Sequence, residues 1–107
     1  MEYAELYFLY EDKIVKKGRT PEELKTVLKW FTGYDTDGLA RQKIEGADLY
    51  TFFEQAPQIN ANADLITGTI CGVKIAEIED PLMKLIRQMD KLVDELAKGK
   101  SLDKILR

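Results

Sequence analysis

Apolar side chains recur at intervals of three and four residues along most of the chain, which is the spacing of one face of an α-helix. The first such stripe consists of Tyr3, Leu6, Tyr7, Tyr10 and Ile14. A second stripe consists of Leu24, Val27, Leu28 and Phe31. The sequence therefore predicts two amphipathic helices before residue 34, the first ending near Gly18 and the second at Gly33.

The start of the second helix carries the strongest local signal in the sequence. Thr20, Pro21, Glu22 and Glu23 form a capping-box pattern with proline at the first helical position. The Thr20 hydroxyl is expected to accept the backbone N–H of Glu23, and the Glu23 carboxylate to accept the N–H of Thr20.

Two shorter helices are expected in the middle of the chain. Residues 35–38 read Asp-Thr-Asp-Gly, a turn cluster that can cap a helix running through Leu39 and Ile44. Another short helix is expected over Leu49 to Gln55, ending before Pro57 because the residue that precedes proline disfavours helical dihedral angles.

Residues 64–78 fit two kinds of structure. Their isoleucine, leucine and valine residues match a buried helix, which we favour, while the threonines and β-branched residues also suit strands. The alternative is a short hairpin within residues 64–76, with Gly68 and Gly72 marking bends. In either case the segment is expected to be core, with Cys71 as a buried and inert thiol.

The last long segment predicts the longest helix of the chain. Asp80 and Pro81 open it, and Gly99 ends it. Its apolar stripe comprises Leu82, Leu85, Ile86, Met89, Leu92, Val93 and Leu96, and charged residues occupy the opposite face. Ser101 is a candidate cap for a final short helix that carries Leu102, Ile105 and Leu106.

These elements predict a mainly α fold: one compact domain, residues 1–107, of about five to six helices ending in a long amphipathic helix. The alternative is an α+β fold with the short hairpin. A chain of 107 residues with 45% hydrophobic and 33% charged residues has the balance of an ordinary globular domain. No apolar run is long enough to span a bilayer, and acidic Glu2 and Glu5 stand where a signal peptide is basic, so we expect a cytoplasmic protein.

The composition of the chain excludes several kinds of catalytic and metal-binding site. The chain has no histidine, which excludes Ser-His-Asp and Cys-His catalysis and every histidine-containing zinc site within it. Residues 35–38 resemble part of a calcium loop, but aligning Gly38 with its invariant glycine puts Gly33 and Ile44 where carboxylate ligands are required. We therefore expect no metal and no cofactor.

Two further hypotheses concern binding of small ligands or nucleic acid. Glu79 and Asp80, with Tyr34 and Arg41, are candidate ligand-binding residues of a small-ligand binder or an enzyme if the fold gathers them in one cleft. Residues 24–43 can also be laid over a helix-turn-helix, with Arg41, Gln42 and Lys43 facing a major groove. A net charge of −3 and the acidic Asp35 and Asp37 argue against this second hypothesis, so a structural helix pair is favoured.

The leading hypothesis is a non-enzymatic interaction module that forms a homo-oligomer. The apolar stripe of the final long helix is broad, and a small monomer does not always cover such a stripe. The candidate interface residues on that helix are Leu85, Met89, Leu92 and Leu96.

Several strings in order resemble a bacterial family known as domain of unknown function 2200. They are residues 17–20 (KGRT), 30–34 (WFTGY), 52–57 (FFEQAP), 77–83 (EIEDPLM) and 90–100 (DKLVDELAKGK), followed by 104–107 (KILR). The chain differs at Phe8, where the family carries proline. The resemblance implies a bacterial cytoplasmic domain and supplies no catalytic residue.

Overall fold

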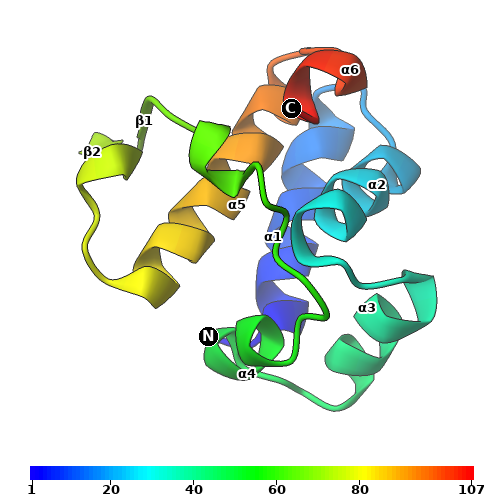
Figure 1. The fold of residues 1–107 in the computed structure, drawn as a ribbon. Helices are drawn as coiled ribbons and strands as arrows, with labels where there is room; N and C mark the ends of the chain where they lie inside the picture. The colour runs from blue at the N-terminus through cyan, green and yellow to red at the C-terminus, as the bar shows by residue number, and fades with distance from the viewer.

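The computed structural model describes residues 1–107. Helix α1 (Tyr3–Lys16) lies at the centre of the fold, and three of the helices that follow it, α2, α3 and α5, pack against it (Figure 1). The other helices are α2 (Pro21–Thr32), α3 (Thr36–Ile44), α4 (Leu49–Glu54), α5 (Pro81–Ala97) and α6 (Leu102–Ile105). The mainly α prediction is confirmed, and every residue of the first predicted stripe is buried. None of the helices has the length and apolarity needed to cross a membrane.

The start of α2 has the predicted capping box. The backbone N–H of Glu23 donates to the Thr20 hydroxyl over 3.2 Å, and the N–H of Thr20 donates to the Glu23 carboxylate over 3.1 Å. At the other end, Gly33 has the predicted left-handed conformation with φ of 80°. A side chain at Gly33 would place its Cβ 2.8 Å from the carbonyl oxygen of Gln58, so the position requires glycine for two reasons.

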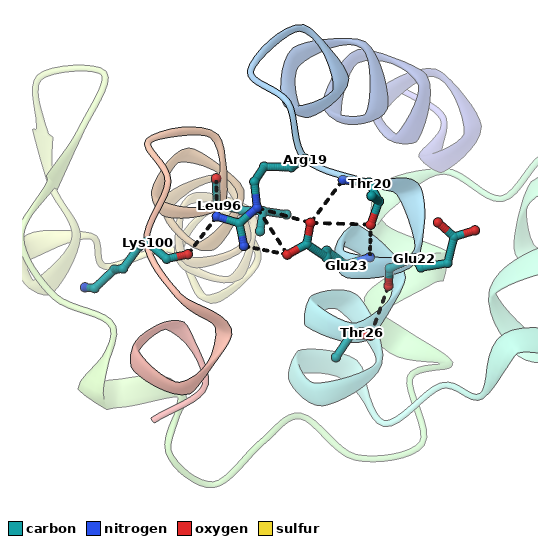
Figure 2. A network of polar contacts seen from close by, with 7 residues as sticks. All are labelled: Arg19, Thr20, Glu22, Glu23, Thr26, Leu96 and Lys100. Carbon is teal, nitrogen blue, oxygen red and sulfur yellow. Dashed lines mark hydrogen bonds and ion pairs between the residues drawn. The ribbon is translucent and has the colours of Figure 1, made fainter.

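Arg19 ties the α1–α2 connection to the end of α5 (Figure 2). Its Nη1 donates to the carbonyl oxygen of Leu96 in the last turn of α5, at 3.3 Å, and to that of Lys100 just beyond the helix, at 2.8 Å. The same guanidinium contacts both carboxylate oxygens of Glu23. One side chain therefore completes the ends of two helices.

The favoured helix over residues 64–78 is wrong, and the hairpin alternative is correct. Two 3-10 turns, Ala63–Leu65 and Ile75–Glu77, flank the antiparallel strands β1 (Thr69–Ile70) and β2 (Val73–Lys74). Positive φ angles at Gly68, Cys71 and Gly72 are incompatible with a right-handed helix, and the last two residues form the two-residue turn of the hairpin. The hairpin projects from the side of α5 (Figure 1).

Cys71 is also not where the sequence placed it. The prediction of a buried thiol is wrong, because the residue sits at the tip of the hairpin and is exposed. The residues of this segment that are buried include Ile66, Ile70 and Ile75. These three side chains anchor the hairpin to the core, while its turn faces solvent.

Candidate interaction surfaces

Three of the four predicted interface residues are part of the protein's own core. Met89, Leu92 and Leu96 have no exposed surface, because the stripe of α5 packs against α1 and α2. Their assignment to an interface is therefore wrong. Leu85 differs, since it lies nearer the start of α5 and is only half-buried.

The predicted ligand-binding residues are not gathered around an open cleft. Tyr34 is buried, and its hydroxyl donates to the carbonyl oxygen of Phe52 over 2.7 Å. Asp80 accepts the N–H groups of Leu82 and Met83 as the cap of α5. Arg41 and Glu79 are exposed, and none of the four predicted residues lines the grooves described below. No group of three or more carboxylate or cysteine side chains is arranged to hold a metal ion.

Two of the three residues that the helix-turn-helix hypothesis places in a major groove are not free to contact DNA. Gln42 is buried and donates to the side chain of Gln55 over 2.9 Å. The Nζ of Lys43 lies 3.9 Å from the ring centroid of Tyr7, a cation–π contact within the fold. Only Arg41 is exposed for contact with a nucleic acid.

The structure reveals an apolar groove between α4 and the first half of α5, which we call the α4–α5 groove. It has a volume of about 250 Å³ and is lined by Tyr50, Phe53, Glu54, Leu82 and Leu85. The groove exists because α4 has only six residues and covers part of a helix of seventeen. The apolar side chains in the first two turns of α5 remain partly exposed as a result.

One charged residue, Glu54, lines this groove, and no basic side chain is among its lining residues. Tyr50 stands at the edge with 62% of its surface exposed. The arrangement combines an apolar floor with one acidic side chain, that of Glu54.

A second apolar surface covers the outer side of α1. Phe8, Leu9 and Val15 have 68%, 52% and 50% of their surface exposed. Shallow depressions flank Phe8 on both sides, bordered by the acidic Glu5, Glu11 and Asp12 and by Lys16, which forms an ion pair with Asp12 over 2.9 Å. We call Glu5, Phe8, Leu9, Val15 and Lys16 the outer face of α1.

Both surfaces escaped prediction from sequence for the same reason. One buried apolar stripe was predicted for each helix, and the apolar residues beside that stripe were assigned neither to the core nor to a surface. Phe8, Leu9 and Val15 all fall off the stripe of α1, and this surplus was the available signal. Tyr50 carried a weaker signal, because α4 is too short to show a clear periodicity.

Comparison with known proteins identifies the family. A family model described as an uncharacterized protein conserved in bacteria, DUF2200, matches residues 1–107. The chain belongs to this family. The DUF2200 chain is also similar to the crystal structure of the uncharacterized protein SP1917, at 42% sequence identity and a TM-score of 0.93, over 99% of this chain and 87% of that one. No curated protein matches it.

Proposed function

We propose that this DUF2200 protein is a non-enzymatic interaction module whose α4–α5 groove binds a basic, amphipathic segment of a partner protein. The observation that carries the proposal is the combination of a partly exposed apolar floor with the acidic side chain of Glu54. Apolar anchors at helical spacing suit such a groove, and lysine or arginine residues beside them complement Glu54.

The size of the groove favours anchoring side chains over a whole metabolite. Sites for small molecules have volumes of about 300 to 1,000 Å³ and enclose most of their ligand. The α4–α5 groove has about 250 Å³ and is open to solvent. Tyr50 is an exposed aromatic residue at its edge, a residue type enriched at the energetic centres of interfaces.

A designed peptide tests this proposal. A 14-residue helical peptide with leucine at every third or fourth position and lysine elsewhere is titrated into ¹⁵N-labelled protein. A peptide with glutamate in place of lysine serves as the charge-reversed control. We expect saturable shifts of the backbone amides of Tyr50, Glu54 and Leu82 with the lysine peptide, and much weaker shifts with the glutamate peptide.

Two variants make the test specific to the groove. Tyr50→Ala removes an apolar wall and Glu54→Lys reverses the charge that lines the groove, so both weaken binding of the lysine peptide. Ile44→Ala is the matched control, since Ile44 is 84% exposed and lies outside the groove. Equal binding of both peptides, or shifts confined to other surfaces, would contradict the proposal.

The outer face of α1 supports a second function, which is self-association. Glu5 lies near the start of α1 and Lys16 at its end, so antiparallel pairing of two copies brings Glu5 of each beside Lys16 of the other. Phe8, Leu9 and Val15 then occupy the space between these charges. Parallel pairing would place like charges together and is disfavoured.

A charge exchange tests this arrangement by analytical ultracentrifugation. Glu5→Lys alone and Lys16→Glu alone are each expected to weaken the dimer, and the double variant to restore it, because exchanging both charges regenerates the pairs. Phe8→Glu should abolish it, and Ile44→Glu should not affect it. A wild-type protein that is monomeric up to millimolar concentration would disprove self-association and leave the groove proposal intact.

A further inference from the structure

A small, largely enclosed cavity lies where α1, α2 and α3 meet. Its volume is about 60 Å³, and its lining residues are Tyr3, Tyr7, Lys25, Thr36, Leu39, Ala40 and Lys43. The cavity is separate from the α4–α5 groove and from the outer face of α1, with which it shares no lining residue.

One of the cavity's tyrosines has a hydrogen-bonding group without a partner. Tyr3 is fully buried, and its hydroxyl makes no hydrogen bond to any protein group. Leaving such a group buried without a partner costs about 1 to 3 kcal/mol. The ring of Tyr3 is held in place by stacking on Phe52, with centroids 4.1 Å apart, so the hydroxyl has little freedom to turn toward another acceptor.

The two lysines at the cavity form no ion pair, although the ammonium group of Lys43 contacts the ring of Tyr7, which also lines the cavity. Lys25 and Lys43 are both half-buried, and neither takes part in any of the eight ion pairs of the protein,. No carboxylate is among the lining residues. Glu11 and Glu22 are near enough to contribute to the raised pKa of Tyr7, after its burial, yet neither lines the cavity.

We propose that this cavity binds a small oxyanion, between a carboxylate and a phosphate in size. The ammonium group of Lys25 and the Tyr3 hydroxyl supply donors that have no protein acceptor, while the ammonium group of Lys43 contacts the ring of Tyr7. Thr36 adds a hydroxyl in the first turn of α3, at the positive end of that helix.

The volume of the cavity limits the ligand to a small oxyanion or to the anionic group of a larger molecule. A bound water needs about 10 to 15 Å³ of such space, so the cavity has room for roughly four to six positions of that size. A carboxylate or a phosphate group fits within it. A sugar or a nucleobase does not, so any larger molecule would have to place only its anionic group inside.

Thermal unfolding at constant ionic strength tests the proposal with acetate, sulfate and inorganic phosphate. An anion that binds only the folded protein raises its melting temperature in a saturable way. We expect Lys25→Met and Lys43→Met each to weaken binding about tenfold, the loss of one charged hydrogen bond. Lys17→Met is the matched control, because it removes the same charge at an exposed position outside the cavity.

Tyr3→Phe gives a signature that general electrostatic attraction does not produce. The variant removes the unpartnered hydroxyl, so without anion it should melt at a higher temperature than the wild type, while its affinity for the anion falls. The proposal is overturned if no anion gives a saturable effect up to tens of millimolar, or if Lys17→Met reduces the effect as much as the two cavity variants.

Discussion

The guanidinium of Arg19 holds the carboxylate of Glu23 through two of its nitrogens, with 2.6 Å between Nη2 and Oε2 and 3.1 Å between Nε and each carboxylate oxygen. Because Glu23 also accepts the N–H of Thr20, the ion pair is part of the cap of α2 (Figure 2). Charged and neutral donors thus converge on one carboxylate.

This relationship makes stability depend on acid. The hydrogen bond from Arg19, followed by the bond from the backbone of Thr20, lowers the pKa of Glu23 from 4.5 to about 2. Glu23 therefore contributes stability above pH 4.5 that is lost as the pH falls through 2. Urea unfolding between pH 7 and pH 2 should show a smaller decline for Glu23→Gln than for the wild type.

The neighbouring carboxylate provides the control for this experiment. Glu22 is exposed and forms no ion pair, although its backbone oxygen accepts the hydroxyl of Thr26. Glu22→Gln should follow the acid profile of the wild type. If the Glu22 and Glu23 variants show identical profiles, the ion pair with Arg19 does not govern acid stability.

Two glycines with similar backbone angles should respond differently to alanine. Gly18 and Gly33 have φ of 84° and 80°, so alanine at either costs about 1 to 2 kcal/mol in backbone strain. At Gly33 the new Cβ would also meet Gln58 at 2.8 Å, whereas nothing lies within 4 Å of it at Gly18. We expect Gly33→Ala to lower the free energy of unfolding by about 1 to 3 kcal/mol more than Gly18→Ala does, measured by urea denaturation.

The buried stripe of α5 should behave as core. Leu92→Ala is expected to reduce the free energy of unfolding by about 2 to 5 kcal/mol, since Leu92 is fully buried. Met83→Ala, on the same helix but 42% exposed, should cost about 1 kcal/mol or less. A Leu92 variant that kept full stability and changed only the oligomeric state would restore the interface interpretation of this stripe.

The hairpin turn offers a stabilising substitution. Cys71 has φ of 51° and precedes Gly72 with φ of 78°, the combination that favours Asn-Gly in a two-residue hairpin. Cys71→Asn should raise the free energy of unfolding by a few tenths to about 1 kcal/mol, while Cys71→Val should lower it. Calorimetric melting of both variants measures the difference, and an increase for valine would contradict the assigned turn.

Local signals predicted most of the helical fold. The capping box at Thr20, the left-handed glycine at position 33 and the stripe of α1 each follow from interactions within a few residues, so the sequence alone was sufficient. The hairpin was less accessible, because isoleucine and valine suit both structures. Its turn depends on a cysteine at positive φ, a conformation that sequence pattern does not favour.

The candidate surfaces needed the three-dimensional structure. Whether Leu92 faces another copy or its own core depends on where α1 and α2 lie, and periodicity cannot decide this. The α4–α5 groove likewise depends on the length of α4 relative to α5. The anion cavity joins residues from three helices, and no local pattern links Tyr3 to Lys25 and Lys43.

The contact between Arg19 and the end of α5 also constrains the order in which the chain folds. Arg19 lies 77 and 81 residues before the two carbonyl groups that it binds. The pair with Glu23 forms within one helical turn, whereas the contacts with these carbonyl groups close a long loop that must form before the fold is complete. Truncation before Lys100 would leave the cap of α2 intact and remove the contact between Arg19 and Lys100 beyond the end of α5.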